Sequence, residues 1–235
     1  MWEPPSVIPD NYNYNSHFHE PFHAVFTLFH ELVDYKKYFP LYYPQPYLYI
    51  TKDIIPFNQK KLCAMVVGKH SSSHPQELYS KREAMISFFE KNAPTQFDLY
   101  GIGWDQTLHP CYKGKIPNKL PYLRNYKFAI CYENMISQTY ITEKLFDILH
   151  AGCIPIYWGA IKITEYIPFK AYILREQFAS DADLYTFINS MSPEEYQTYI
   201  DAGKSFFKSK QAQLFSIPTF VNNILTILFA HKNIK

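Results

Sequence analysis

The sequence predicts an α/β fold in which a mostly parallel sheet is covered by helices on both faces. Between residues 60 and 175, short apolar runs with the length of strands alternate with longer segments of helical pattern. Such alternation favours a parallel sheet, because each crossover returns the chain to the same end of the sheet through a covering helix. Apolar residues make up 47% and charged residues 19% of the 235 residues, which is typical of globular proteins.

The first two predicted strands come before residue 101. Residues 62–67, Leu-Cys-Ala-Met-Val-Val, form a buried strand that ends at Gly68 and a polar loop, and residues 78–91 follow as a helix. Residues 97–100, Phe-Asp-Leu-Tyr, form the second strand. Four turn-forming residues then predict a long loop: Pro110, Gly114, Pro117 and Pro121.

Three more strands are predicted after this loop, at residues 126–132, 153–157 and 171–174, with a helix at 142–151 between the first two. Ligands of open α/β sheets bind beyond the carboxyl ends of the strands. We therefore expect the functional site in the loops that follow Val67, Tyr100, Tyr132 and Tyr157.

Helix starts are predicted at two further places. Ser192 is the N-cap of a helix that has Pro193 at its first position and Glu195 three residues after the cap. The spacing Asp181-Ala-Asp183 resembles the metal-holding motif of many transferases, but it follows a serine and is interpreted here as the acidic start of a helix. A last helix is expected at residues 219–231.

The chain divides into three predicted parts. Residues 1–57, rich in Pro, Tyr, His and Asn, contain no complete sheet and are either an extension or the end of an N-terminal domain. Residues 58–217 form the α/β domain and residues 218–235 the C-terminal helix. Within the first part, His19 and His23 stand four residues apart, which favours the polar face of a helix over a zinc site.

Charge and apolar patterning argue against several classes of function. The formal net charge is only +2 and lysine is spread along the chain, so no nucleic-acid surface is predicted. The four cysteines form no CxxC pair and are interpreted as free thiols. The first residues lack the basic and apolar regions of a signal peptide, and the apolar run 224–230 is too short to cross a bilayer. We expect no membrane segment.

The most informative stretch is the predicted strand–turn–helix around residue 140. Asn134 follows the strand, and Thr142 is placed to cap the helix. A helix start offers free N–H groups and the positive end of the dipole, which suits a phosphate, and Lys144 would add a cation. Glu143 would repel a phosphate and suits the vicinal hydroxyls of a ribose. On spacing alone, an ordinary helix-start carboxylate and a solvated lysine remain the alternative.

Three linked blocks of this stretch resemble the signature of family 10 glycosyltransferases, the α-1,3/4-fucosyltransferases. They are Tyr-Lys-Phe-Ala-Ile-Cys-Tyr-Glu-Asn at 126–134, Tyr-Ile-Thr-Glu-Lys-Leu at 140–145 and Gly-Cys-Ile-Pro-Ile-Tyr-Trp-Gly at 152–159. Their order and spacing over about 34 residues match the family pattern, which is far more specific than one short motif. Weaker similarity covers residues 60–180 and includes Tyr-Ser-Lys-Arg at 79–82.

The resemblance implies a GT-B-type fold, two facing Rossmann-like domains of which the C-terminal one holds GDP-fucose. It implies that Glu143 contacts the ribose and Lys144 the diphosphate of this donor. Asn134 and Tyr140 would line the donor pocket, and Arg82 matches an arginine of the family. No metal or other cofactor is implied as essential.

The implied reaction is an inverting transfer of fucose to a hydroxyl of an N-acetylglucosamine-containing acceptor, an oligosaccharide or glycoconjugate, in α-1,3 linkage. Glu3, in Trp-Glu-Pro-Pro, matches the carboxylate proposed as the base in the family. Most of the acceptor-binding domain that should precede Glu3 is missing from this sequence. A basic residue that the family often places near the loop after the second strand has three possible substitutes: Lys113, Lys115 and Arg124.

Two alternatives stay open beside fucosyl transfer. The same fold could use another sugar nucleotide, or the chain could be a truncated and inactive nucleotide-sugar-binding module. The cellular location expected for the protein depends on its source organism: the cytoplasm in a bacterium, or the Golgi membrane in a eukaryote if an N-terminal anchor has been lost.

Overall fold

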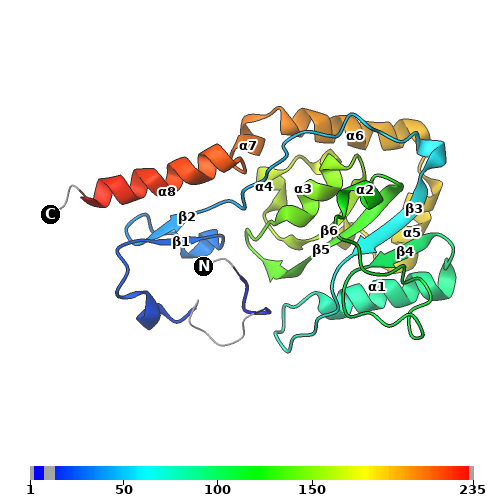
Figure 1. Cartoon of the computed structure of the whole chain (residues 1–235), viewed down its shortest axis with the longest axis horizontal. Helices are drawn as coiled ribbons and strands as arrows, with labels where there is room; N and C mark the ends of the chain where they lie inside the picture. The colour runs from blue at the N-terminus through cyan, green and yellow to red at the C-terminus, as the bar shows by residue number, and fades with distance from the viewer. Residues whose placement is uncertain (1–2, 8–13, 233–235) are drawn as a thin grey trace.

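The structure, a computed structural model, describes residues 3–7 and 14–232, with side chains up to residue 230 (Figure 1). Its centre is a parallel sheet in the order β4-β3-β5-β6-β7. The strands are β3 Lys61–Val66, β4 Phe97–Tyr100, β5 Tyr126–Ser137, β6 Ile154–Ala160 and β7 Ile173–Leu174. The predicted α/β fold with a parallel sheet is confirmed.

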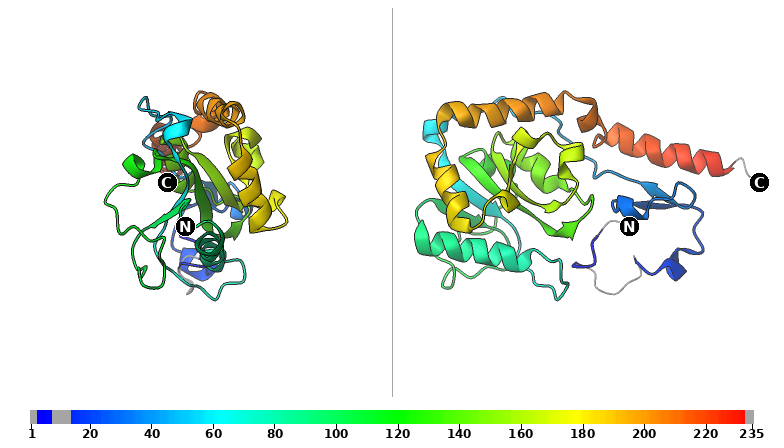
Figure 2. Two further views of the ribbon diagram at one scale, coloured as in Figure 1. Left: turned by 90° about the vertical axis from the view of Figure 1, so that its right-hand side faces the viewer. Right: turned by 180° about the vertical axis from the view of Figure 1, so that it is seen from behind.

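Helices cover both faces of this sheet, as Figures 1 and 2 show. Side chains of β5 alternate between two cores: Ala129 and Cys131 belong to one, Phe128 and Ile130 to the other. The first core is closed by α3 (Glu143–His150) and the end of α6 (Pro193–Phe207); the second is closed by α1 (Tyr79–Asn92), α5 (Asp181–Ser190) and the start of α6. The remaining helices are α2 Leu120–Leu123, α4 Ile163–Tyr166, α7 Lys210–Gln213 and α8 Ile217–Lys232.

Strand β5 is longer than predicted, because it runs on to Ser137 instead of ending at residue 132. The extension has backbone partners of its own: Ile136 N donates to Gln76 O at 2.8 Å, and Leu78 N to Asn134 O at 3.1 Å. The pairing register with β6 shifts between Tyr132 and Ser137. Asn134, which was expected to follow the strand, therefore lies inside its irregular end.

The predicted caps are present where the sequence places them. Thr142 caps α3, Ser192 accepts from Glu195 N and caps α6, and a serine at residue 180 accepts from Asp183 N at the start of α5. Asp181 is paired with Arg175 at 2.7 Å, so the interpretation of the acidic pair as a helix start is confirmed. Within residues 101–125 the expected loop contains the one-turn helix α2. The first backbone N–H of this helix, that of Leu120, donates to Asn118 Oδ1.

The N-terminal part contains a small parallel pair of strands, β1 Val25–Thr27 and β2 Tyr38–Pro40. The helix predicted around His19 and His23 is wrong: His19 lies in a single 3-10 turn, and its Nδ1 is 2.9 Å from the Tyr38 hydroxyl, so tertiary contact decides the local conformation. His30 joins this part to the sheet domain, because its amide donates to Thr139 Oγ1 at 2.9 Å.

Helix α8 runs away from the sheet and past β1 and β2 (Figures 1 and 2). Phe220 and Ile224 of α8 pack against a third, smaller core that contains Leu28, Phe29 and Tyr140. The first half of α8 thus packs against the N-terminal part of the chain and against Tyr140. None of the described helices is long and apolar enough to cross a membrane.

Candidate functional site

Four of the five predicted donor-binding residues come from three elements that meet at the carboxyl end of β5, and the fifth, Tyr140, lies in the connection between β5 and α3. Asn134 lies on the irregular end of β5, Glu143 and Lys144 begin α3, and Arg82 is in the first turn of α1. Thr142 sits before α3 with extended backbone angles, and its hydroxyl accepts from Lys144 N at 3.5 Å. The positive end of α3 is therefore directed at this edge of the sheet.

Glu133 is the organising residue of the site, a role that its sequence position did not suggest. It is fully buried. Its carboxylate accepts from Thr142 N at 2.8 Å, from Thr142 Oγ1 at 2.8 Å and from Lys144 Nζ at 3.1 Å. A Cβ at Gly159 would lie 2.5 Å from Glu133 Cγ, so a glycine of β6 leaves the room that this carboxylate needs. The buried charge is satisfied only while its donors stay in place.

Lys144 is held as a cation at this edge. Its side chain is 20% exposed, and its Nζ lies 3.1 Å from Glu133 and 4.0 Å from Glu143. Burial disfavours the charged form, but the two carboxylates outweigh it and raise the pKa of Lys144 above its ordinary value. A charged ammonium next to a helix N-terminus is suited to bind an anion.

Glu143 is the more accessible carboxylate, with 34% of its side chain exposed. Burial opposes its ionisation, but Lys144 and Lys119 overcome this effect and lower the pKa of Glu143. Glu143 is therefore an acceptor-only group at neutral pH. It could accept hydrogen bonds from hydroxyls that lie next to the α3 start.

Lys119 was not among the predicted site residues, yet the structure brings it to Glu143. Its Nζ lies 3.8 Å from Glu143 and 2.6 Å from Asp147, one turn further along α3. Of the three basic residues nominated from sequence, Lys113 is paired with Asp98 at 3.7 Å instead. Lys115 and Arg124 make no ion pair within the described part of the chain. The unpredicted one-turn helix α2 is what directs Lys119 toward α3.

Arg82 lies behind Asn134 and is only 3% exposed. Its Nη2 donates to Asn134 Oδ1 at 3.0 Å and to Tyr132 O at 2.7 Å, while its guanidinium lies 4.9 Å from the centre of the Tyr79 ring. Its buried Nε has no partner among the residues described. Arg82 thus fixes the Asn134 amide, and its positive charge partly opposes the net rise in the pKa of Lys144.

Tyr140 connects the site to the N-terminal part. Its ring is stacked on Phe29, with centroids 5.5 Å apart and planes 3° from parallel. Its amide donates to Ser137 Oγ at 2.9 Å. With 3% exposure, the ring acts as a wall rather than as an open platform.

Glu3 lies next to Tyr14 in the N-terminal part. The Tyr14 hydroxyl donates to the Glu3 carbonyl oxygen. After burial, which is the main cause, the Glu3 carboxylate helps to raise the pKa of Tyr14 and of Tyr140. The Glu3 carboxylate is therefore close enough to both tyrosines to affect them electrostatically.

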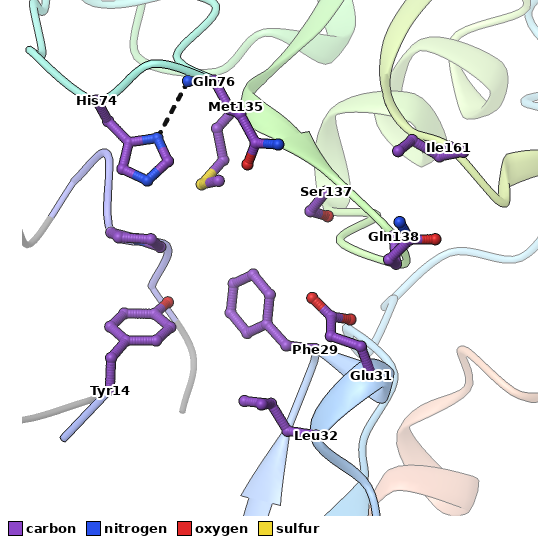
Figure 3. Close-up of a pocket in the computed structure, with 11 residues that line it drawn as sticks. Tyr14, Phe29, Glu31, Leu32, His74, Gln76, Met135, Ser137, Gln138 and Ile161 are labelled. Carbon is purple, nitrogen blue, oxygen red and sulfur yellow. Dashed lines mark hydrogen bonds between the residues drawn. The ribbon is translucent and has the colours of Figure 1, made fainter. Parts of the chain in front are cut away.

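A cavity of about 320 Å³ opens beside these residues (Figure 3). Tyr14, Phe29 and Glu31 come from the N-terminal part, while Ser137 and Gln138 come from the end of β5 and the turn after it. The six other lining residues are Pro5, Leu32, His74, Gln76, Met135 and Ile161. The cavity therefore lies where the two parts of the chain face each other.

Comparison with known proteins identifies the family. The family model described as glycosyltransferase family 10 (fucosyltransferase), C-terminal part, matches residues 57–221. The chain belongs to this family. The match covers the sheet, the α3 start and every predicted donor-binding residue, whereas Glu3 and the N-terminal wall of the cavity lie outside it.

Curated relatives of this family 10 chain are fucosyltransferases. GDP-fucose protein O-fucosyltransferase 3 of Bos taurus is 34% identical over 82 residues, which is 34% of this chain and 17% of the relative. The 4-galactosyl-N-acetylglucosaminide 3-alpha-L-fucosyltransferase 9 of Rattus norvegicus is 25% identical over 170 residues, 68% of this chain and 44% of the relative. The chain thus spans less than half the length of either relative.

Solved structures agree on the fold. An α1,3-fucosyltransferase crystallised with GDP-fucose superimposes with a TM-score of 0.56 at 20% identity, over 93% of this chain and 71% of that one. TarM superimposes with a TM-score of 0.59 at 10% identity, over 88% of this chain and 44% of that one. The family 10 chain has the fold of GT-B-type glycosyltransferases.

Proposed function

We propose that this chain binds GDP-fucose and transfers fucose, with inversion and in α-1,3 linkage, to a glycan that contains N-acetylglucosamine. The observation that carries the proposal is the α3 start in a chain of the fucosyltransferase family: a capped helix N-terminus, the cation Lys144 and the ionised Glu143 lie side by side. Each group suits a different part of one nucleotide sugar.

The diphosphate is assigned to the N-terminus of α3 and Lys144. Negative charge grows on the leaving diphosphate as the bond to fucose breaks, and fixed cations and N–H dipoles stabilise it without reorganisation. Glu143 takes the ribose hydroxyls, because a carboxylate accepts from two neighbouring O–H groups. Asn134, fixed by Arg82, and Tyr140 form the remaining wall of the donor site.

Glu3 is assigned as the general base. It removes the proton of the acceptor hydroxyl while the hydroxyl oxygen attacks the anomeric carbon of fucose and GDP departs from the opposite face. The contact of Glu3 with Tyr14, a residue that lines the cavity, supports this assignment. Lys144 and the helix dipole supply the positive charge, so we propose that no divalent metal is required.

The acceptor is the least determined part of this proposal. The relatives differ in the acceptor that their names give: a protein for one and an N-acetylglucosaminide for the other. An inactive donor-binding module and the use of another sugar nucleotide are the competing functions.

The test is a transfer assay with the chain as it stands. GDP-fucose is offered with N-acetyllactosamine or with a Ser/Thr peptide, with and without EDTA, and products are read by mass spectrometry. We expect the disaccharide to gain one deoxyhexose in both conditions. Product on the peptide alone would reassign the acceptor, and loss of activity with EDTA would reveal a metal. If the chain binds GDP tightly but forms no fucosylated product and releases no GDP from GDP-fucose, the inactive module would be favoured.

A further inference from the structure

Helix α8 carries apolar side chains on two adjoining sides, and only one of these sides is covered. The inner side is covered, because Phe220 and Ile224 pack against the core that contains Leu28 and Phe29. Beside it lies a row of exposed apolar residues, called here the outer stripe: Ile217, Val221, Leu225, Leu228 and Phe229. Each of them exposes between 42% and 58% of its surface to solvent.

The outer stripe is continuous along the helix. Its members follow one another at spacings of three or four residues, and residues with these spacings are neighbours on one side of an α-helix. At about 100° per residue, they fall within about a third of the circumference, and the exposed Asn222 and Thr226 form the polar side. Single exposed apolar side chains are ordinary, but a continuous row is typical of an interaction surface.

The position of α8 leaves this surface accessible. Figures 1 and 2 show that the helix leaves α7 and runs along the outside of the molecule, away from the sheet. A partner can therefore reach the outer stripe without displacing any element of the sheet domain.

The charge of the chain around α8 differs from that of the rest. Residues 202–235 contain five lysines and neither Asp nor Glu, whereas residues 1–201 contain 18 Lys and Arg against 21 Asp and Glu. Lys208 and Lys210, just before α8, are exposed and form no ion pair with any residue in the described ranges 3–7 and 14–232. Such an asymmetry favours a negatively charged partner for this segment.

The combination of apolar stripe and lysines distinguishes between three kinds of partner. A second copy of this chain would bring its own lysines to the contact, and the segment has no carboxylate to pair with them. A nucleic acid would bind the lysines but leave the outer stripe in water. A bilayer that contains anionic lipids satisfies both, because its acyl region covers apolar side chains and its headgroups attract lysines.

We propose that α8 is an interfacial helix that docks this chain on the surface of a membrane containing anionic lipids. The outer stripe enters the boundary between headgroups and acyl chains, with the helix axis parallel to the membrane plane, while Lys208 and Lys210 contact the headgroups. With 16 residues, α8 lies on the bilayer and does not cross it. The proposal goes beyond the proposed function and does not depend on it, because no residue of the donor site takes part.

Co-sedimentation with lipid vesicles tests the docking. The chain is mixed with vesicles of phosphatidylcholine alone, or of phosphatidylcholine and phosphatidylserine in equal amounts, and the bound fraction is measured against lipid concentration. We expect binding to the vesicles with phosphatidylserine and much weaker binding to phosphatidylcholine alone. Binding should weaken as the salt concentration rises, because salt screens the attraction between exposed lysines and headgroups.

One double variant tests the outer stripe. It carries Leu228→Gln and Phe229→Gln, and its matched control carries Leu108→Gln and Phe169→Gln, which change an exposed leucine and an exposed phenylalanine outside α8. The stripe variant should lose at least about tenfold in vesicle affinity, because two apolar side chains no longer leave water on binding. The control should bind within about twofold of wild type.

A second double variant tests the lysines. It carries Lys208→Gln and Lys210→Gln, and its control carries Lys52→Gln and Lys91→Gln, two exposed lysines outside the C-terminal segment. A lysine near an anionic surface contributes about fivefold in affinity, so the first variant should lose at least about tenfold and the control far less. Circular dichroism and GDP affinity should be unchanged in all four variants, which separates loss of docking from unfolding.

Each contrary outcome overturns the docking. No binding of the folded chain to vesicles with phosphatidylserine would do so, as would equal losses in the α8 variants and their controls. Loss in the lysine variant alone would reveal a charge contact in which α8 is not buried. A dimer in sedimentation velocity that the stripe variant dissociates, without vesicle binding, would assign the outer stripe to a second copy. If the chain binds vesicles as expected but does not bind GDP, the docking stands and the proposed function is wrong.

Discussion

At the residue scale, Lys144 and Glu143 are neighbours with separate tasks. Lys144→Gln keeps hydrogen-bond donors near Glu133 but removes the cation from the diphosphate, where charge grows as GDP leaves. We expect the rate of GDP release from GDP-fucose at saturation to fall at least about tenfold, or about 1.4 kcal/mol, with a smaller loss of GDP affinity. Steady-state kinetics and calorimetric titration measure the two effects.

Glu143→Ala should show the opposite pattern. The ribose hydroxyls do not change charge during the reaction, so their acceptor affects binding rather than turnover. GDP affinity should weaken by about 1.5–3 kcal/mol, the range for hydrogen bonds to charged groups. If neither Lys144→Gln nor Glu143→Ala changes GDP affinity or turnover, both are only helix-start side chains.

Lys119 gives a prediction that only the structure could provide. Its Nζ forms ion pairs with Glu143 at 3.8 Å and with Asp147 at 2.6 Å. Lys119→Met should weaken GDP binding by about 0.5–1.5 kcal/mol, because Glu143 loses its orientation toward the ribose. The loss should shrink for 2′-deoxy-GDP, which lacks one of the hydroxyls. An equal loss for both nucleotides would mean that Lys119 acts on the phosphates or on folding.

At the scale of elements, the α3 cap carries both the site and part of the stability. Thr142→Ala removes a cap worth about 1 kcal/mol and one hydroxyl donor of the buried Glu133, worth about 1.5–3 kcal/mol more. Thr142→Ser keeps both interactions and should recover most of the loss. Urea unfolding measures the free energies, and a Thr142→Ala loss below about 0.5 kcal/mol would show that Glu133 does not depend on this cap.

The contact between the N-terminal part and the sheet domain should depend on pH through His30. Its Nε2 donates to Leu41 O at 2.8 Å, and its Nδ1 lies 3.2 Å from the Tyr166 hydroxyl. Burial lowers the pKa of His30 below its ordinary value of 6.5. The hydrogen bond to Leu41 O and the charge of Glu31 oppose this shift, and Lys162 adds to it. Because the folded state resists protonation, stability is complete above pH 6.5 and falls as the pH drops from there toward the folded-state pKa.

His30→Gln should remove this part of the pH dependence. Thermal unfolding of wild type and variant between pH 8 and pH 5 makes the comparison. The expected difference is about 1.4 kcal/mol for each unit by which the folded and unfolded pKa values differ. Parallel curves for the two proteins would show that His30 has the same pKa in both states.

Local sequence patterns predicted most helices and strands, because hydrophobic periodicity and helix caps depend only on residues close together in the sequence. The strand at 97–100, the α3 start at Thr142 and the α6 cap at Ser192 follow from neighbouring residues alone. The extension of β5 to Ser137 depends on backbone partners near Gln76, sixty residues away, and no local pattern contains that information. The same is true of His19, whose partner Tyr38 lies on β2.

At the scale of the whole molecule, the site could be predicted only in part. The three blocks at 126–159 indicated Glu143 and Lys144, because a nucleotide site at a helix start has a compact signature. Glu133, Lys119 and the cavity wall at Glu31 are brought together by tertiary packing of separate segments. The resemblance implied two facing domains, but it did not indicate which residues of the N-terminal part line this cavity.

The central claim is that the edge formed by β5 and α3 is a GDP-fucose site. Calorimetric titration of the chain with GDP and with UDP tests it most directly. The account predicts that GDP binds at least about tenfold more tightly than UDP and that a hundredfold excess of GDP over its Kd stabilises the fold by about 2.7 kcal/mol. Equal affinity for the two nucleotides, or no binding of GDP, would contradict it.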